Sequence, residues 1–427
     1  MVGGPLFQIL QTYRNQTSLK MRPLTPYVAE LAVNPSACHR ADYGPAQTRI
    51  LNADGLDTAK AIISAWPDYQ PTPLVALAGL ARAADVKSLH YKDEAHRFGL
   101  KSFKPLGGAF AVARMLIREL PRIIGEADIT INDLLVGRHK KAVSRFTVTA
   151  ATDGNHGRSV AWGARMFGCS CVIFINEAVS EGREKAIASY GAEVRRNPGS
   201  YDDAVRKAQT TAEAEGWYVI ADTSNDITLQ APHDVTQGYA VMAAETIDQL
   251  PYDEAPTHIF LQAGVGGMAA ATCAQFWQDF GPKRPKTILV EPVNAACWFA
   301  SLSAGHPVVI DGDLDSLMGG LACGEVSRLA WEILATGADA MMTIEDAAAA
   351  DCMRLLAEGS YGDPLIVAGE SGVAGLAGFL AATRDDEMRR TLGLDGNSRV
   401  VVFGTEGATD PDTYAEIVGR TTEGLTQ

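Results

Sequence analysis

Lys104 is the residue whose type and surroundings most directly suggest covalent chemistry. It ends a polar stretch that includes Lys101, and it is followed by Pro105 and a run of apolar residues typical of a helix. A lysine amine forms a Schiff base with an aldehyde only when it is unprotonated, and apolar surroundings lower its pKa toward that condition. Because a lysine at the start of a helix is more commonly a solvated cation, its interpretation depends on its neighbours.

A glycine-rich loop joins a predicted strand to a predicted helix later in the chain. It contains Gly264, Val265, Gly266, Gly267 and Met268. Small residues here let backbone N–H groups converge on an anion at the helix N-terminus. The spacing differs from the G-x-G-x-x-G pattern of dinucleotide-binding loops. The loop therefore favours a single phosphate over a dinucleotide, although glycines also serve plain helix–sheet packing.

Polar side chains follow three other predicted strands. Asp153 and Asn155 stand between a strand and a helix, Asp222 closes a second strand, and Thr405 follows the last one. Each has an ordinary interpretation as a cap or turn residue. In open α/β sheets, however, ligands bind beyond the carboxyl ends of the strands, so these side chains are expected in one cleft. An amine, a phosphate loop, an amide and a hydroxyl together meet the binding needs of pyridoxal phosphate.

The elements that must position these residues form a regular alternation. Short β-branched runs alternate with longer amphipathic or apolar segments, which predicts an α/β fold with parallel sheets covered on both faces. The predicted strands are 88–93, 145–151, 170–175, 217–222, 258–263, 287–291, 340–344 and 399–403. The predicted helices include 157–167, 181–190, 202–215, 234–250 and 268–280. The proline-containing first 45 residues are expected to form an irregular arm packed on the main body.

Composition narrows the class of protein. A chain of 427 residues with 47% hydrophobic residues can bury a sizeable core, and its length favours two or three domains. The net charge of −14 argues against nucleic acid or an anionic membrane as the main partner. The seven cysteines form no C-x-x-C pair and the eight histidines show no metal-ligand spacing. With no signal peptide or membrane span evident, we expect a cytoplasmic protein that binds no metal.

The order of these motifs resembles that of the fold-type II pyridoxal-phosphate enzymes, the group of the tryptophan synthase β subunit. Within this group the chain is most similar to the diaminopropionate ammonia-lyases. The more specific matches are residues 92–94, 97–100, 152–158, 160–162, 262–266, 320–325, 369–372 and 405–407. They spread from about residue 66 to residue 410, whereas the segments before residue 60 and from 224 to 232 do not clearly match.

The resemblance implies a fold and an assembly. It implies two open, twisted, mostly parallel sheets covered by helices, with the cofactor in the cleft between a large and a small domain. We expect the large domain to comprise residues 1–110 and 224–427, and the small domain residues 111–223. The family also implies a homodimer.

The resemblance further implies β-elimination from 2,3-diaminopropionate to pyruvate and ammonia. Lys104 would hold the cofactor and then remove the Cα proton of the substrate. Asp153 and Asp222 would place carboxylates near the substrate's β-amino group, and Asp153 could accept a proton on the opposite face. The other residues expected to contact the cofactor are Phe103, Asn155, Gly264, Val265, Gly266, Gly267, Met268 and Thr405.

Alternatives remain open at this point. The same cofactor could support dehydration of serine, threonine or another hydroxy-amino acid, or a β-replacement. The fold could also serve a non-catalytic binding or regulatory protein. Cys297 and Cys323 lie in family-like segments, but the sequence alone does not show whether their sulfur atoms approach bonding distance.

Overall fold

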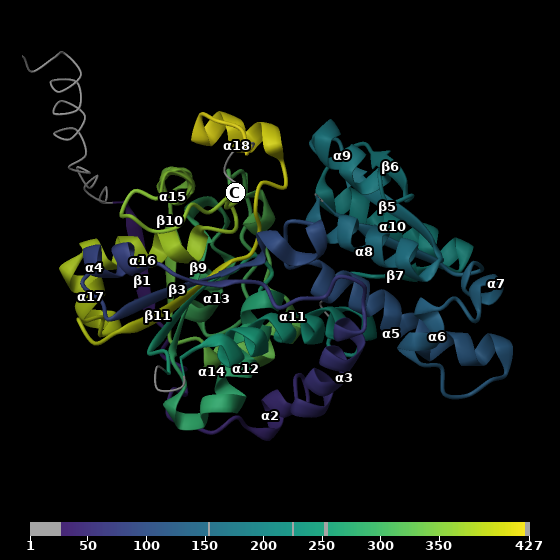
Figure 1. Cartoon of the computed structure of the whole chain (residues 1–427), viewed down its shortest axis with the longest axis horizontal. Coiled ribbons are helices and arrows are strands. Elements are labelled where there is room, and N and C mark those ends of the chain that lie inside the picture. Colours follow the sequence, from purple (N-terminus) through teal and green to yellow (C-terminus); the bar gives the residue numbers. More distant parts are fainter. Residues whose placement is uncertain (1–26, 153, 224–225, 252–254, 423–427) are drawn as a thin grey trace, which may run out of the picture.

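The computed structural model describes residues 27–152, 154–223, 226–251 and 255–422. Asp153, one of the residues predicted to be catalytic, lies outside the described residues. Figure 1 shows two parts side by side, each built on its own sheet, with the smaller part at the right.

The larger sheet has seven strands in the order β1-β10-β9-β8-β11-β3-β2. The five inner strands run parallel, and the two edge strands, β1 and β2, pair antiparallel with their neighbours. The strand bounds are β1 Ala29–Val33, β2 Leu74–Ala76, β3 Ser88–Asp93, β8 His258–Gln262, β9 Lys286–Pro292, β10 Ala340–Ile344 and β11 Arg399–Gly404.

The smaller sheet has four parallel strands in the order β6-β5-β4-β7. Their bounds are β4 Thr147–Ala151, β5 Ser170–Asn176, β6 Glu193–Asn197 and β7 Tyr218–Val219. All four fall within the range 111–223 expected for the small domain, and the strands of the larger sheet fall outside it. Helix α5 (Pro105–Ile124) runs through the expected boundary at residues 110–111 and connects the two parts.

The inner strands are buried on both faces, which explains their continuous apolar sequences. In β8, Ile259 and Leu261 belong to one hydrophobic core and Phe260 belongs to another. Successive side chains of a strand point to opposite faces, so a sheet covered by helices on both sides needs apolar residues at every position. The predicted fold class is therefore confirmed, with two mostly parallel sheets flanked by helices.

The helices cover these sheets and place their N-termini near the strand ends. Helices α8 (Asn155–Phe167), α9 (Glu181–Ala188) and α10 (Tyr201–Glu215) pack on the smaller sheet. The remaining α-helices are α2 Pro45–Thr48, α3 Ala53–Ser64, α4 Ala78–Ala83, α6 Ile131–Leu135, α7 Lys140–Val143, α11 Gln230–Gln249, α12 Gly267–Phe280, α13 Cys297–Ala304, α14 Arg328–Gly337, α15 Asp346–Glu358, α16 Ala374–Arg384, α17 Asp386–Leu392 and α18 Pro411–Val418. The 3-10 helices are η1 Glu94–Gly99, η2 Gly281–Lys283, η3 Val293–Ala295 and η4 Gly319–Leu321.

Two expectations from the sequence need correction. The predicted strand 217–222 is observed only at Tyr218–Val219. The backbone turns away after residue 220, because the carbonyl oxygen of Ile220 accepts a hydrogen bond from His156 Nε2 at 2.7 Å instead of pairing with a strand. The expected irregular arm contains strand β1 in its described part, since the free edge of β10 supplies partners for its backbone.

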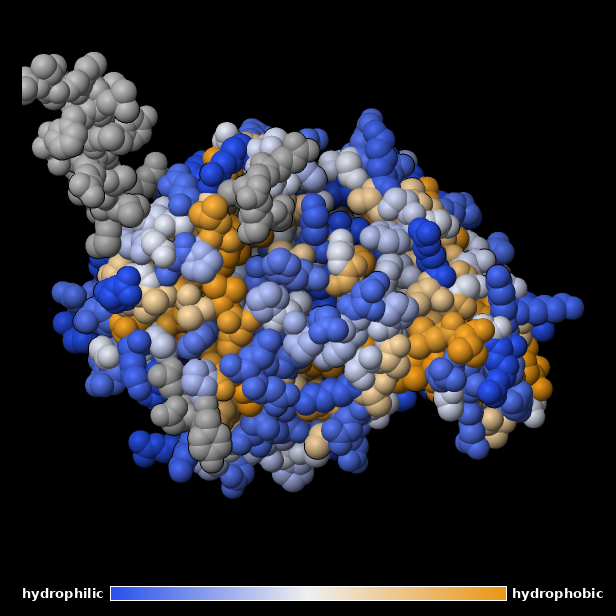
Figure 2. Space-filling view, in the orientation of Figure 1, coloured by the Kyte–Doolittle hydropathy of each residue, from blue (hydrophilic) through white to orange (hydrophobic). Residues whose placement is uncertain are grey.

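The surface seen in Figure 2 is mainly hydrophilic, with apolar residues gathered in separate patches. No helix in the described part of the chain combines the length and apolar character needed to cross a membrane.

Candidate active site

One cleft collects the site residues predicted from the sequence. It lies where the loops after β4, β8 and β11 meet the start of α5, at the carboxyl ends of parallel strands. Its lining includes every described residue predicted for the site, namely Phe103, Lys104, Asn155, Asp222, Gly264, Val265, Gly266, Gly267, Met268 and Thr405. Thr152 and Gly154, the neighbours of Asp153, also line it.

Lys104 and Asp222 form an ion pair in this cleft. Lys104 Nζ donates to Asp222 Oδ2 at 2.7 Å, and His156 Nδ1 lies 3.8 Å from the same oxygen. Burial alone would raise the pKa of Asp222, but the nearby His156 and Lys104 outweigh it and hold this pKa below its usual range. Burial lowers the pKa of His156 and outweighs the opposing effect of the Asp222 charge.

The pKa of Lys104 differs from the expectation based on its apolar sequence context. Burial alone lowers the pKa, as expected, but the negative charge of Asp222 and the hydrogen bond to it outweigh burial, so the pKa is raised. Local sequence could not reveal this, because Asp222 reaches Lys104 from a loop 118 residues further along the chain. Lys104 is therefore an ammonium group in this arrangement, and it must lose both its proton and its partner to act as a nucleophile.

The segment that carries Lys104 is tied to the loop after β11. Phe103 N donates to Thr405 O at 3.0 Å, and Gly407 N donates to Lys101 O at 2.9 Å. Lys101 has a left-handed backbone with φ of 55°, and its side chain is exposed. The turn thus directs Lys101 to solvent and Lys104 into the cleft.

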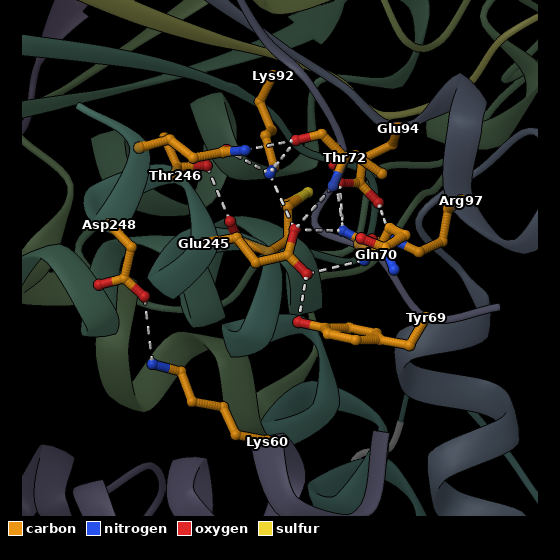
Figure 3. A network of polar contacts seen from close by, with 12 residues as sticks. Lys60, Tyr69, Gln70, Thr72, Lys92, Glu94, Arg97, Glu245, Thr246 and Asp248 are labelled. Atoms are coloured by element: carbon orange, nitrogen blue, oxygen red, sulfur yellow. Dashed lines mark hydrogen bonds and ion pairs between the residues drawn. The ribbon is translucent and has the colours of Figure 1, made fainter. Parts of the chain in front are cut away.

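A buried network of charges anchors the start of the same segment (Figure 3). Arg97 donates two hydrogen bonds to Glu94 at 2.8 Å and two to Glu245 of α11 at 2.7 and 2.8 Å. Lys92 Nζ donates to Glu245 Oε2 at 2.9 Å and to Thr72 O at 2.8 Å. The side chains of Lys92, Glu94, Arg97 and Glu245 are at most 4% exposed. The family-like residues 92–94 and 97–100 therefore include the buried anchor of the loop that bears Lys104.

Three helix N-termini converge on the cleft without a side-chain cap. The capping residues are Lys104 for α5, Gly154 for α8 and Gly266 for α12. Uncapped N-termini present backbone N–H groups and a partial positive charge, which together bind anions. The α12 terminus follows the glycine loop, as the sequence predicts.

The shape of this loop requires glycine at two positions, because a Cβ atom at either of them would lie too close to neighbouring atoms. At Gly266, where φ is 98°, a Cβ would lie 2.3 Å from Cζ2 of Trp298. At Gly264 it would lie 3.1 Å from both Cys323 Sγ and Gly320 O. A substitution at Gly266 would therefore disturb the fold, because the added Cβ atom collides with the buried Trp298 ring.

Gly267 provides the cleaner test of the phosphate loop. A Cβ at Gly267 would make ordinary contacts, 3.5 Å from Thr236 Oγ1 and 3.8 Å from a ring carbon of Tyr239. A Gly267→Ala variant should therefore fold, and its added methyl group should hinder close approach of a phosphate to the loop. We expect its dissociation constant for pyridoxal phosphate to rise about 10-fold or more, measured by titration of the apoenzyme. An unchanged constant would place the phosphate elsewhere.

Thr405 and Asn155 have partners that bear on their predicted roles. Thr405 Oγ1 accepts a hydrogen bond from Gln262 Nε2 at 2.7 Å, which leaves the hydroxyl proton to be donated to a ring nitrogen. Asn155 Nδ2 donates to Glu406 Oε2 at 2.6 Å, and its Oδ1 accepts from Arg158 at 3.1 Å. Asn155 would have to exchange the contact with Glu406 to bind a cofactor oxygen through its amide.

The cleft also contains functional groups that the sequence analysis did not assign. Glu370 and Glu406 lie close together, and burial and the charge of Glu406 raise the pKa of Glu370. Arg183 of α9 donates to Glu370 Oε1 at 3.3 Å across the cleft. The matches at 369–372 and 405–407 mark both glutamates, but nothing in the sequence pairs them with Arg183.

The cysteines are all free thiols, Cys297 and Cys323 included. Within the described ranges, no group of three or more His, Cys, Asp or Glu side chains could hold a metal ion. The donor set of the cleft is instead an amine, three helix N-termini and a hydroxyl, which fits pyridoxal phosphate.

Comparison with known proteins agrees with this donor set. Residues 65–406 match the family model described as "Pyridoxal-phosphate dependent enzyme". The diaminopropionate ammonia-lyase of Escherichia coli K12 is 39% identical over 82% of this chain and 87% of its own length. The crystal structure of the holo diaminopropionate ammonia lyase from Escherichia coli matches with a TM-score of 0.82 and 34% identity, covering 92% of this chain and 97% of that one. A structure of the same enzyme in complex with D-serine matches with the same TM-score, identity and coverage.

Proposed function

Because the chain belongs to the diaminopropionate ammonia-lyase family of pyridoxal-phosphate-dependent enzymes, we propose that it eliminates the β-amino group of 2,3-diaminopropionate to give pyruvate and ammonia. Bound pyridoxal phosphate supplies an electron sink for negative charge at the substrate Cα. The residues that would hold it are Lys104 through Nζ, the 264–268 loop at the α12 N-terminus, Phe103, Asn155 and Thr405.

The ion pair at 2.7 Å between Lys104 and Asp222 carries the proposal. It demonstrates that the Asp222 carboxylate already binds a primary alkylammonium ion inside the cleft. The β-ammonium of diaminopropionate has the same chemistry and can replace Lys104 as the partner of Asp222. A hydroxyl group in that place would gain much less, because it carries no charge.

The same exchange keeps Lys104 suited to catalysis once its Nζ is no longer joined to the cofactor. The Asp222 carboxylate raises the pKa of Lys104. When Asp222 pairs with the substrate ammonium instead, the neutral amine at Lys104 Nζ is favoured. This amine can then accept the Cα proton on its own face of the substrate. Asp153 would accept the proton on the other face.

A panel of substrates tests the reaction. We expect kcat/KM for diaminopropionate to exceed the values for serine and threonine by at least about 100-fold, because a site built for a charged partner rejects a neutral analogue strongly. Pyruvate and ammonia are measured for diaminopropionate and serine, and 2-oxobutyrate and ammonia for threonine. Equal or higher values for serine or threonine would contradict the proposal in favour of a dehydratase.

We further propose a homodimer in the cytoplasm, with the domains divided at residues 110–111 and 223–224. Seven free thiols suit a reducing compartment. The family relationship supports the dimer.

A further inference from the structure

Tyr239 occupies a central place in the cleft. It belongs to α11, is 2% exposed and lies in the cleft lining. Its ring centroid lies 4.6 Å from that of Phe103, and Lys104 Nζ lies 5.8 Å from the Tyr239 centroid. Tyr239 is thus fixed beside the lysine expected to hold the cofactor.

The hydroxyl of Tyr239 is buried and has no hydrogen-bond partner among the described residues. An unsatisfied buried hydroxyl is costly, and such groups in a ligand cleft require an explanation. Burial raises the pKa of Tyr239 above its ordinary value and outweighs the opposing effect of the nearby Lys104 ammonium, so the phenol keeps its proton and can act as a donor. The group is suited to a negatively charged acceptor that enters the cleft.

The neighbours of the ring show which part of a ligand the hydroxyl would meet. A Cβ at Gly107, in the first turn of α5, would lie 2.7 Å from Cζ of Tyr239, the carbon that bears the hydroxyl. A Cβ at Gly267, the first residue of α12, would lie 3.8 Å from the opposite ring edge. The phenol is therefore wedged between two uncapped helix N-termini, one of which follows the glycine loop.

We propose that the Tyr239 hydroxyl donates a hydrogen bond to the phosphate group of pyridoxal phosphate, alongside the backbone of the 264–268 loop. This inference rests on the cofactor of the proposed function, but not on the identity of the amino-acid substrate. Tyr239 is then a cofactor-binding residue supplied by α11, a helix in which the sequence analysis marked no site residue.

Equilibrium binding of two cofactors tests the contact. The apoenzyme and its Tyr239→Phe variant are titrated with pyridoxal phosphate and with pyridoxal, which lacks the phosphate. A hydrogen bond to a charged oxygen corresponds to roughly 10- to 100-fold in a dissociation constant. We expect this loss for pyridoxal phosphate and no change for pyridoxal.

Tyr414→Phe is the matched control. The Tyr414 hydroxyl is also buried without a hydrogen-bond partner in the described structure, but it lies in α18, outside the cleft lining. Neither substitution should lower the unfolding temperature of the apoenzyme, because each removes only an unsatisfied group. Only Tyr239→Phe should reduce the increase in that temperature caused by pyridoxal phosphate.

The outcomes separate the competing explanations. Equal weakening of pyridoxal and pyridoxal phosphate would overturn the proposal and assign the hydroxyl to Lys104 or the ring of the cofactor. An unchanged constant for pyridoxal phosphate would overturn it as well. Failure of the unmodified protein to bind pyridoxal phosphate would instead refute the proposed function.

Discussion

The Lys104→Ala variant is expected to lose turnover of diaminopropionate by more than about 10⁴-fold. Loss of a general base alone costs up to about that factor, and Lys104 would also provide the covalent attachment of the cofactor. The cofactor should still bind the glycine loop, but without a covalent link. Steady-state kinetics measure the first effect, and borohydride reduction followed by peptide mapping measures the second.

Lys101→Ala is the matched control for this variant. Lys101 is exposed, lies outside the cleft lining and directs its Nζ to Ala408 O at 3.4 Å. Its removal should leave the covalent cofactor and most of the activity in place. Borohydride labelling of Lys101, or of any lysine other than Lys104, would contradict the assignment.

The second large effect concerns the two enantiomers of diaminopropionate. In the proposed function the single amine of Lys104 reaches only one face of the substrate Cα, so a base on the other side is needed if both enantiomers react. Asp153→Asn keeps the shape of the side chain and removes its basicity. We expect it to reduce kcat/KM for the D-enantiomer by about 10²–10⁴-fold and to affect the L-enantiomer much less.

Asp222→Asn provides the contrast within the same cleft. Because the proposed partner of Asp222 is the β-ammonium common to both enantiomers, both kcat/KM values should fall. Equal losses of D- and L-activity in Asp153→Asn would exclude the assignment of two bases. Unchanged activity in Asp222→Asn would contradict the proposed role in binding the β-ammonium and leave Asp222 as a structural partner of Lys104 only.

The regular elements around the site could be predicted because the spacing of apolar residues along the chain reflects which side chains are buried. The predicted strands 88–93 and 340–344 coincide with β3 and β10, and the predicted helix 202–215 differs from α10 by one residue. The edge strands β1 and β2 were not predicted. Strand β1 pairs with β10, which is distant in sequence, and β2 is only three residues long, so neither produces a clear periodic pattern of its own.

The composition of the site could be predicted more fully than its electrostatics. Motif order placed Lys104, Asn155, the glycine loop and Thr405 at strand ends, which the topology brings into one cleft. The raised pKa of Lys104 and the Glu406 contact of Asn155 both arise from groups more than 100 residues away. Tyr239 lies in a helix whose sequence shows only burial, so its unsatisfied hydroxyl became visible only in three dimensions.

The buried charges beneath the Lys104 loop also constrain how this sequence can evolve. Removing one partner of a buried ion pair costs roughly 3–5 kcal/mol, a large part of the 5–15 kcal/mol that stabilises a typical protein. Lys92, Arg97, Glu94 and Glu245 share partners, so their substitutions are not independent. A protein with apolar residues at all four positions could be as stable. However, each single substitution toward it would leave a buried charge without its partner. The four positions are therefore expected to change together or not at all among descendants of this protein.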